Sequence, residues 1–402
     1  MENPKIRFKG FTKDWEQRKF GEVVEKYEDP VETPTEGYMR LGIRSHAKGT
    51  FHNYVEKGKE LETAKMFRVA ADKFIVNITF GWEHAVAITD KNDAGKLVSH
   101  RFPQYSFNEG MIPKFFRYLI LDESFKHHLE LSSPGGAGRN RVLKLNEMLE
   151  YKMSFPSEEE QKKIASYFEK LDHLITLHQR KCDQTKNLKK YMLQKMFPQN
   201  GAKVPENRFD GYTYDWEQRK LGDIGSTFTG LSGKTKEDFG HGDAQFITYM
   251  NVFSNPVANL EMTEAVEIDA KQNCVKKGDV FFTTSSETPE EVGMSCVMPE
   301  NKDNIYLNSF CFGYRPTEKF DLDYLAYVLR ADSFRQEMTF LAQGISRYNI
   351  SKNKVMEVSI PIPNLEEQTM VGQYFSNLDH LITLHQRQTD FYKKTSFYFI
   401  SS

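Results

Sequence analysis

The sequence predicts an α+β fold in which two mixed α/β domains are joined by two long antiparallel coiled-coil helices, with a pseudo-twofold internal repeat. Three observations lead to this prediction. The decapeptide LDHLITLHQR occurs at residues 171–180 and again at 378–387. The segment RFKGFTKDWEQRKFGEV, from Arg7, is matched by RFDGYTYDWEQRKLGDI, from Arg208. The residues between these repeated ends share almost no sequence. A repeat of ten residues is implausible by chance, so we interpret the chain as a tandem duplication.

The repeats also set the expected domain boundaries. The copies lie 201 residues apart at Trp15 and Trp216 and 207 residues apart at the decapeptide, so the second copy is longer in its middle. We expect a first domain over residues 1–156, a central spacer helix over 157–197, a second domain over 198–363 and a C-terminal spacer helix over 364–402. The total of 402 residues allows each domain its own core.

Both expected helices have clear start signals and a one-sided apolar stripe. Ser157 with Glu160, and Asn364 with Glu367, fit a capping box. The stripe residues recur at helical spacing and are expected to form the spacer coil: Ile164, Phe168, Leu171, Leu174 and Ile175 in the first helix, and Val371, Phe375, Leu378, Leu381 and Ile382 in the second.

The simplest arrangement pairs the two helices antiparallel, with the decapeptide packed on its own copy. The alternative is that each stripe packs on its own domain. A helix over residues 157–197 is roughly 60 Å long at about 1.5 Å per residue, which favours a rigid spacer.

The two middles are expected to mix strands and helices. DKFIVNITF (72–80) and GDVFFTTSS (278–286) lie at matching positions, and both are rich in strand-forming residues. The stretches 112–131 and 320–341 have the apolar periodicity of amphipathic helices.

Composition predicts a cytoplasmic protein. No run of 18 apolar residues is present, and the N-terminal MENPKIRFKGF lacks the apolar segment of a signal peptide. The four cysteines form neither a disulfide framework nor a metal-ligand spacing, so we expect free thiols and no metal site. The formal net charge of −2 argues against a protein that binds nucleic acid through phosphates alone.

No catalytic motif emerges. TGLSGKT (229–235) places Gly230 only three residues before Gly233, which is too close for a nucleotide-binding P-loop. The Gly-rich segment 132–141 precedes no dinucleotide pattern. His127 and His128 are adjacent, so they diverge on a helix. With different middles between duplicated ends, these observations favour a binding subunit over an enzyme.

The order of these segments resembles the specificity subunits of bacterial type I restriction-modification enzymes. The resemblance covers essentially the whole chain and rests on DWEQRKFGEV and DWEQRKLGDI, on IPIPNLEEQ before the second helix, and on FEKLDHLITLHQR and FSNLDHLITLHQR. GDVFFTTSSETPEEVG (278–293) and GISRYNIS (344–351) are similar to segments of that family's target-recognition domains. The sequence departs from the family's pattern in two places, at the first-half loop GGAGRNRV and at the C-terminal KKTSFYFISS.

The resemblance implies that each middle is a target-recognition domain that reads one half of a bipartite, asymmetric site in double-stranded DNA. It implies that the helices set the gap between the half-sites and that the repeated ends dock two modification subunits. No cofactor is expected in this chain. S-adenosylmethionine, for adenine methylation, and ATP with Mg²⁺, for translocation and cleavage, would belong to the modification and restriction subunits.

Candidate DNA contacts are the hydrogen-bonding and cationic residues of the expected loops. In the first domain they are Arg40, Arg44, Ser45, His46, Lys48, Trp82, His84, Arg101, Arg139 and Arg141. In the second they are Lys234, Lys236, Tyr249, Asn251, Ser285, Ser286, Thr288, Ser346, Arg347 and Tyr348. No catalytic residue is expected. The alternatives are a two-ended protein scaffold without DNA readout and a stand-alone nuclease or methyltransferase.

Overall fold

The computed structural model describes residues 6–61, 63, 65–135, 141–199 and 201–401, with side chains as far as Ser396. It divides into two compact units, which are described separately below. Unit 1 comprises Met1–His178 and Arg387–Ser402, and unit 2 comprises Gln179–Gln386. Each unit therefore contains one mixed domain together with part of each long helix. None of the helices in these ranges is both long and apolar enough to cross a membrane.

The described residues of unit 1 form three sheets. A two-stranded antiparallel sheet pairs β1 (Glu16–Lys19) with β11 (Lys152–Phe155). A four-stranded antiparallel sheet has the order β2-β10-β7-β8, formed by Val24–Tyr27, Gln104–Phe107, Lys73–Val76 and Val86–Ile88. A five-stranded mixed sheet has the order β3-β6-β9-β4-β5, formed by Pro30–Glu32, Lys65–Arg68, Leu97–Val98, Tyr38–Ile43 and Thr50–Val55.

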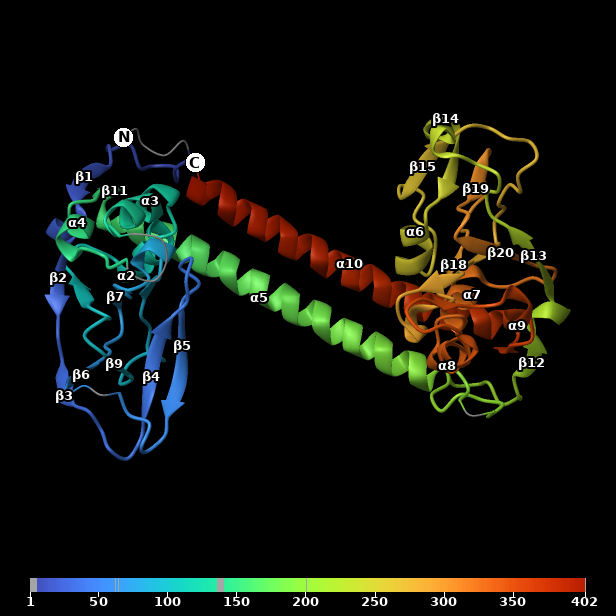
Figure 1. Cartoon of the computed structure of the whole chain (residues 1–402), viewed down its shortest axis with the longest axis horizontal. Coiled ribbons are helices and arrows are strands. Elements are labelled where there is room, and N and C mark those ends of the chain that lie inside the picture. The colour runs from blue at the N-terminus through green and yellow to red at the C-terminus, as the bar shows by residue number, and fades with distance from the viewer. Residues whose placement is uncertain (1–5, 62, 64, 136–140, 200, 402) are drawn as a thin grey trace. The chain divides into compact units, whose positions relative to one another are not determined.

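The short helices of unit 1 gather near β1 and β11, and the five-stranded sheet lies at the other end of the unit (Figure 1). These helices are α1 (Phe20–Val23), η1 (Gly81–Glu83), α2 (Pro113–Leu119), α3 (Glu123–Leu131) and α4 (Leu145–Leu149). The core between the helices and the four-stranded sheet is aromatic. The ring centroid of Phe20 lies 4.9 Å from that of Phe74, and Phe116 and Phe125 belong to the same buried cluster.

In the part of unit 2 that the structure describes there are four sheets. Its two-stranded sheet pairs β12 (Glu217–Lys220) with β22 (Ser359–Ile362), and its four-stranded antiparallel sheet has the order β13-β20-β16-β18. The strands of the latter are Gly225–Thr229, Cys311–Pro316, Val280–Thr283 and Ser295–Val297. A three-stranded sheet has the order β15-β14-β19, formed by Thr263–Val266, Phe239–Ile247 and Ile305–Leu307, and a small sheet pairs β17 (Ser285–Ser286) with β21 (Tyr348–Asn349).

The helices of unit 2 include three that lie at the opposite end of the unit from β14 and β15: α7 (Leu322–Val328), α8 (Asp332–Leu341) and α9 (Lys352–Met356) (Figure 1). The others are α6 (Tyr249–Ser254) and the short turns η2 (Leu221–Asp223), η3 (Lys236–Asp238) and η4 (Pro289–Glu291). Trp216, Tyr314 and Tyr324 are among the largest fully buried side chains in the core.

The two middles share a framework despite their different sequences. The strand order β2-β10-β7-β8 of unit 1 matches β13-β20-β16-β18 of unit 2, and β1-β11 matches β12-β22. β7 (KFIV) and β16 (VFFT) are largely buried, which explains their continuous apolar runs. The remaining sheet differs: five strands in unit 1, against sheets of three and two strands in unit 2. Divergence is therefore concentrated in the structure attached to a common sheet.

The long helices begin and end close to where the sequence predicts. α5 spans Glu158–Lys195 and α10 spans Leu365–Ser401. The predicted capping boxes are only half formed. The Ser157 and Asn364 side chains accept the backbone N–H groups of Glu160 and Glu367 at 3.4 and 2.9 Å. The two glutamate side chains do not return to their helix starts, because each is bound by an arginine instead.

Segments of α5 and α10 run antiparallel within each unit. In unit 1, Tyr392 of α10 packs on Phe168 and Leu171 of α5. In unit 2, Lys189 of α5 binds Asp379 of α10 at 2.6 Å. Through these contacts, the decapeptide of each long helix packs against the residues that follow the decapeptide in the other long helix. The stripe also packs on its own domain: Ile164 contacts the core of unit 1, and Val371, Phe375 and Leu378 belong to the core of unit 2.

Some expectations about secondary structure were wrong in detail. The single amphipathic helices expected over 112–131 and 320–341 are each two helices, α2 with α3 and α7 with α8. In both cases a turn separates the two helices, and both helices pack on the same core. The strand expected over 72–80 ends at Val76. Leu381, expected in the coil, is 42% exposed, whereas Leu174, Ile175 and Ile382 are half-buried.

Candidate nucleic-acid interface

A short hairpin in unit 2, closed by an antiparallel bridge between Gln343 and Asn349, presents one of the predicted loops. β17 and β21 pair through Ser285 with Asn349 and through Ser286 with Tyr348. The chain between them and α8 turns tightly at Gly344, where φ is +150°. A Cβ atom at Gly344 would lie 2.0 Å from the carbonyl oxygen of Arg347, so only glycine fits this turn. The loop therefore holds Ser346 and Arg347 exposed at the surface.

A pocket of about 380 Å³ forms where this hairpin meets α6. The Tyr249 hydroxyl donates to the Ser285 carbonyl oxygen at 2.8 Å, and the Arg347 Nε donates to the Ser285 Oγ at 3.2 Å. The pocket thus brings together five of the predicted residues from three distant parts of the second domain. Its full lining is Tyr249, Met250, Phe253, Ser285, Ser286, Glu287, Glu291, Ser346 and Arg347.

The chemistry of this pocket suits base edges better than phosphate. Arg347 is anchored through Nε to the Ser285 hydroxyl oxygen. Glu287 and Glu291 face the same pocket, and Glu291 accepts the Ser286 hydroxyl at 3.1 Å. Carboxylates repel phosphate but accept hydrogen bonds from base amino groups, whereas arginine pairs with the O6 and N7 acceptors of guanine.

Sequence reasoning missed the apolar side chains around the pocket. Ile345 is 96% exposed, Phe310 is 60% exposed and Met250 is 54% exposed. The Thr284 backbone N–H donates to the Phe310 carbonyl oxygen at 3.1 Å, so Phe310 lies beside the strand that carries Ser285. Exposed apolar side chains beside hydrogen-bonding groups suit contact with the methyl group of thymine. Ile345 lies within the GISRYNIS segment, whereas Phe310 and Met250 lie far from it in the sequence.

The five other candidates of the second domain have different surroundings. Asn251 is fully buried, and its amide exchanges hydrogen bonds with the backbone of Asn259, so it shapes the α6 loop and cannot touch DNA directly. Lys234 pairs with Asp269 at 3.2 Å, which reduces its availability to phosphate. Lys236 and Thr288 are exposed. Tyr348, in β21, is half-buried.

In unit 1 the structure joins two predicted segments into one surface. The backbone N–H groups of His46 and Ala47 donate to the carbonyl oxygens of Glu83 and His84, both at 2.8 Å. The Ser45 hydroxyl donates to the Glu83 carboxylate. His46 and Ala47 have φ angles of 61° and 49°, an uncommon conformation for residues with side chains. This strained turn places Ser45 and His46 beside η1.

The structure buries His84, which the sequence analysis placed among the candidate DNA contacts. Its side chain is 3% exposed, and its Nε2 donates to the Ile120 carbonyl oxygen at 2.8 Å. Burial lowers the pKa of His84, which favours the neutral ring. His84 therefore stabilises the loop at Ser45–Ala47 from the protein interior.

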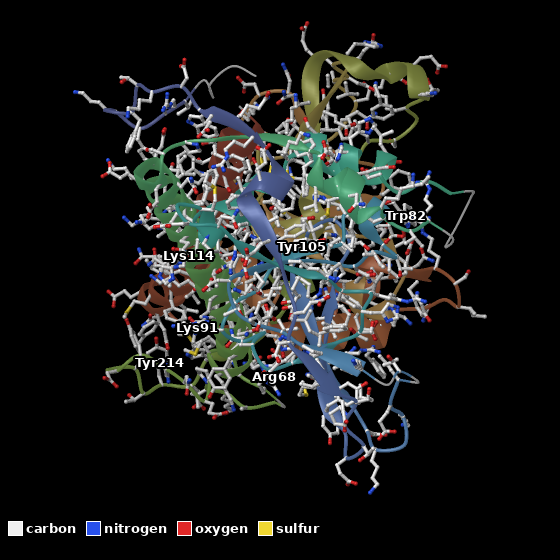
Figure 2. All side chains as sticks on the ribbon, turned by 90° about the vertical axis from the view of Figure 1, so that its left-hand side faces the viewer. Arg68, Trp82, Lys91, Tyr105, Lys114 and Tyr214 are labelled. Carbon is white, nitrogen blue, oxygen red and sulfur yellow. The ribbon has the colours of Figure 1, made fainter. Side chains whose placement is uncertain are left out.

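Two aromatic–cation contacts hold arginines of unit 1. The Arg44 guanidinium lies 5.3 Å from the Phe51 ring centroid. The Arg141 guanidinium lies 5.5 Å from the ring of Trp82, which Figure 2 labels. The Trp82 Nε1 is buried and has no hydrogen-bond partner among the described residues. Arg139, the neighbouring candidate, lies outside those residues.

The remaining candidates of unit 1 have varied surroundings. The Arg101 side chain donates to the Thr79 hydroxyl at 3.3 Å. Arg40 is half-buried in β4. Lys48 lines a cavity of about 450 Å³ together with Asp90 and Asp93. Carboxylates beside the lysine make this cavity unfavourable for phosphate.

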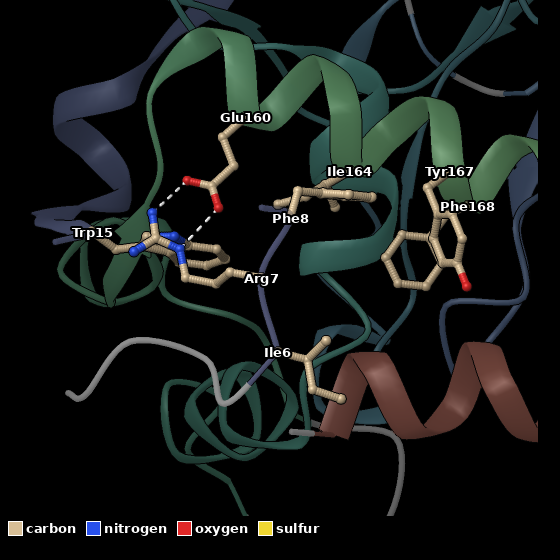
Figure 3. A pocket seen from close by; sticks show the side chains of 8 residues that line it. All are labelled: Ile6, Arg7, Phe8, Trp15, Glu160, Ile164, Tyr167 and Phe168. Atoms are coloured by element: carbon tan, nitrogen blue, oxygen red, sulfur yellow. Dashed lines mark hydrogen bonds and ion pairs between the residues drawn. The ribbon is translucent and has the colours of Figure 1, made fainter. Parts of the chain in front are cut away.

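The repeated ends form an equivalent anchor in both units. In unit 2, Glu367 is fully buried and receives Arg208 in a bidentate pair at 2.7 and 2.9 Å, the Tyr214 hydroxyl at 2.8 Å and the Trp216 Nε1 at 3.1 Å. In unit 1, Arg7 binds Glu160 in the same bidentate way at 2.9 and 2.7 Å (Figure 3). Each anchor ties the start of a domain to the start of its long helix.

The comparison with known families gives a double match. A family model described as "Type I restriction modification DNA specificity domain" matches residues 12–187 and again residues 214–390. The two matched segments correspond to the two copies defined by the repeats.

Among curated proteins, the chain is similar to two from Methanocaldococcus jannaschii. It is 24% identical over 251 residues to the type I restriction enzyme MjaVIII specificity subunit, covering 60% of this chain and 58% of that protein. It is 27% identical over 190 residues to the putative type I restriction enzyme MjaX specificity subunit, covering 45% and 43% of the two chains. The chain thus spans a little over half the length of the first relative.

Among solved structures, three share the fold over nearly the whole chain. The HsdS subunit from Thermoanaerobacter tengcongensis has a TM-score of 0.52 at 18% identity and covers 96% of this chain and 95% of its own. The type I restriction-modification S subunit from M. genitalium has a TM-score of 0.56 at 12% identity, covering 99% and 98%. A structure titled for complex assembly and conformational transition of the type I R-M system has a TM-score of 0.55 at 18% identity, covering 97% of each chain.

Proposed function

Because the chain belongs to the family of type I restriction-modification DNA specificity domains, which it matches over 12–187 and 214–390, we propose that it is the DNA sequence-specificity subunit of a type I restriction-modification complex. In this role the chain recognises double-stranded DNA and catalyses no reaction itself.

The proposal rests on one observation: the two units share the same core framework but differ in their additional sheets and exposed loops. Both units have the same two-stranded and four-stranded sheets and the same arginine–glutamate anchor. The additional sheets and the exposed loops differ between them. Equivalent frames with different loops suit a site of two unlike half-sites, each read by one unit.

In unit 2 we assign base reading to the pocket beneath the hairpin. Arg347 can offer both terminal nitrogens of its guanidinium to one guanine, while its Nε stays bound to Ser285. Glu287 is exposed at the same pocket and can accept the N4 amino group of cytosine. Together these groups are complementary to the major-groove edge of a G·C pair. Phosphate contacts come from other residues and position the unit on the duplex.

The partners in this proposal carry the chemistry. Two modification subunits dock on the repeated ends, bind S-adenosylmethionine and methylate an adenine taken out of the stack. Restriction subunits use ATP and Mg²⁺. The chain has a formal net charge of −2, so these partners supply much of the positive surface that holds the phosphate backbone.

We propose that the long helices set the gap between the half-sites. α5 has 38 residues and α10 has 37, so each is roughly 55 Å long at about 1.5 Å per residue. Antiparallel pairing within each unit, through Tyr392 in unit 1 and Lys189 in unit 2, stiffens both ends of the spacer.

The test is a methylation map. The chain is expressed with its modification subunits in cells without other adenine methyltransferases, and methylated adenines are located by sequencing. The proposal predicts one bipartite motif with a fixed gap. A complex that assembles but leaves no motif would support the scaffold alternative, and methylation by the purified chain alone would make it an enzyme.

A further inference from the structure

The base-reading pocket of unit 2 has two walls that lie outside the four-stranded sheet. One wall is α6, which supplies Tyr249 and Phe253. The other is the segment 287–293, which supplies Glu287 and Glu291 and contains the short turn η4. Neither segment forms part of a strand, so side-chain contacts have to hold both walls against the sheet.

Arg330 holds the first wall. It lies two residues after α7, and its guanidinium donates to the carbonyl oxygens of Val252, Phe253 and Asn255 at 2.9, 3.1 and 2.9 Å. These groups are at the C-terminal end of α6, where a helix leaves acceptors unsatisfied and favours a cation. The Arg330 Nε also donates to the Ser295 carbonyl oxygen at 2.8 Å, which links the end of α6 to strand β18.

Arg335 holds the second wall. It lies in α8, and its guanidinium donates to the carbonyl oxygens of Glu290, Val292 and Gly293, at 2.9 Å for Glu290 and 2.7 Å for Gly293. Burial lowers the pKa of Arg335, and also that of Arg330, to about 10, so both side chains stay charged at neutral pH. Hydrogen bonds from a charged donor are stronger than those from a neutral one.

The turn that Arg335 holds has a counterpart in unit 1. β8 pairs with β7 as β18 pairs with β16, and the residue two positions before the second strand is His84 in unit 1 and Gly293 in unit 2. Their φ angles are 60° and 65°. In unit 1 the turn itself makes the link, because His84 donates to the Ile120 carbonyl oxygen at the end of α2. In unit 2 the glycine has no side chain, and Arg335 makes the link from the helix.

The two arginines belong to the second reader and not to the shared framework. α7 and α8 begin 209 residues after α2 and α3, which places Leu121 at the position of Arg330 and Lys126 at the position of Arg335. Leu121 has no side-chain donor, and Lys126 binds Glu123 on its own helix at 2.7 Å. The arginine links therefore occur only where the loops of the two units differ.

We propose that Arg330 and Arg335 are positioning residues that set the base specificity of the second half-site without touching DNA, each by fixing one wall of the pocket. The inference rests on the proposed function. Arg335 fixes the segment that carries Glu287, and Arg330 fixes the helix that carries Met250. A displacement of about 1 Å takes a hydrogen bond out of its effective range, so a loosened wall no longer distinguishes the bases that it faces.

The test uses lysine at each position, in the full chain with its modification subunits. Lysine keeps the charge, but it lacks the planar fork that reaches several carbonyl groups at once. Methylation mapping should show that Arg335→Lys lowers the preference at the same base pair as Glu287→Ala, by about fivefold or more. Arg330→Lys should do so at the same base pair as Met250→Ala. The first half-site and the gap should stay the same.

A readout without DNA measures the walls directly. Amide hydrogen exchange of the full chain should become at least about tenfold faster in residues 288–294 of Arg335→Lys and in residues 250–256 of Arg330→Lys, because bonds to a charged group are lost there. Glutamine at either position is the second variant. It keeps a donor without the charge and should alter the same base pair.

Two controls separate positioning from general stability. Tyr327→Phe removes the hydrogen bond from α7 to Asp379, so it should lower the unfolding temperature and leave the motif unchanged. Lys126→Gln, at the position of unit 1 that matches Arg335, should change neither half-site.

Three results would overturn the proposal while the unaltered chain still gives its motif. They are unchanged local exchange, faster local exchange with an unaltered motif, and an equal loss of preference in both half-sites. The second would make the arginines stabilising residues only, and the third would indicate general destabilisation. An unaltered chain that gives no bipartite motif would contradict the proposed function itself, and this proposal with it.

Discussion

A single buried carboxylate organises the start of each long helix. Glu367 has no exposed surface and accepts hydrogen bonds from Arg208, Tyr214 and Trp216. The hydrogen bond to Glu367 raises the pKa of Arg208, so the guanidinium stays charged. Removal of one partner from a buried ion pair leaves a charge without compensation, and this costs far more than the net contribution of the intact pair.

The first prediction concerns this carboxylate. Glu367→Gln removes the charge and at least one acceptor position while keeping the shape of the side chain. We expect the free energy of unfolding of the chain to fall by about 3–5 kcal/mol. Chemical denaturation followed by tryptophan fluorescence measures the change. Glu366→Gln, at the exposed neighbouring position, is the matched control and should change little. Equal effects of the two variants would rule out the anchor.

The second prediction concerns Arg347. Arg347→Ala should relax or weaken recognition in the second half-site only, because a bidentate contact to guanine is worth about 1–3 kcal/mol of discrimination. Methylation mapping should show loss of preference at one G·C position. Lys352→Ala, an exposed change in α9, should leave the motif intact. An unaltered motif with Arg347→Ala would make the residue a surface charge.

The third prediction concerns pH. Burial lowers the pKa of His84 in the folded state below its ordinary value of 6.5. The unfolded state therefore binds the proton more readily, and the stability of unit 1 falls as the pH decreases below about 6.5. His84→Gln keeps a donor for Ile120 and should remove this part of the pH dependence. Thermal unfolding at pH 7.5 and 5.5 compares the two chains, and an identical pH dependence would contradict the argument.

At the scale of elements, the long helices were the most predictable part of the molecule. Their start residues and apolar stripes carry strong local signals, and both helices begin within one residue of Ser157 and Asn364. The use of Glu160 and Glu367 was not predictable, because their arginine partners lie 153 and 159 residues away in the sequence. Long-range partners override a local capping preference without leaving a trace in the local pattern.

The recognition loops were only partly predictable. Composition pointed to Ser285, Ser346 and Arg347, which the structure gathers in one pocket. It could not distinguish the exposed Ser346 and Arg347 from His84 and Asn251, which are equally polar but buried. Burial is decided by how loops fold back on the sheets. The exposed Ile345 and Phe310 carry no sequence signal of their own, because an apolar residue is normally assigned to the core.

The fourth prediction tests the spacer. Four residues inserted after Arg180 and four after Arg387, the same position of both decapeptides, add about one turn, or roughly 6 Å, to each helix. The apolar stripes stay nearly in phase, because one turn has about 3.6 residues. B-DNA rises about 3.4 Å per base pair, so the methylated motif should gain one or two base pairs of gap.

The control is an insertion of two residues at the same positions. It rotates the stripes by about 200° and should abolish methylation by disrupting the pairing. An active four-residue variant with an unchanged gap would mean that the helices do not set the spacing, and that the modification subunits position the two units.

At the scale of the whole molecule, duplication explains both the likeness and the difference between the units. Each unit contains the anchor, the β1-β11 or β12-β22 pair, and the four-stranded sheet. Under the proposed function, two modification subunits dock on these elements, and this shared role accounts for their likeness. The loops and added sheets carry no such constraint, which accounts for their divergence.

The central claim is that the two units read DNA independently from a common frame. The most direct test replaces residues 216–363 with the corresponding second domain of another family member and maps methylated adenines in cells that contain the modification subunits. The claim predicts a motif in which one half-site changes, while the other half-site and the gap stay the same. A motif changed in both halves, or unchanged in both, would contradict it.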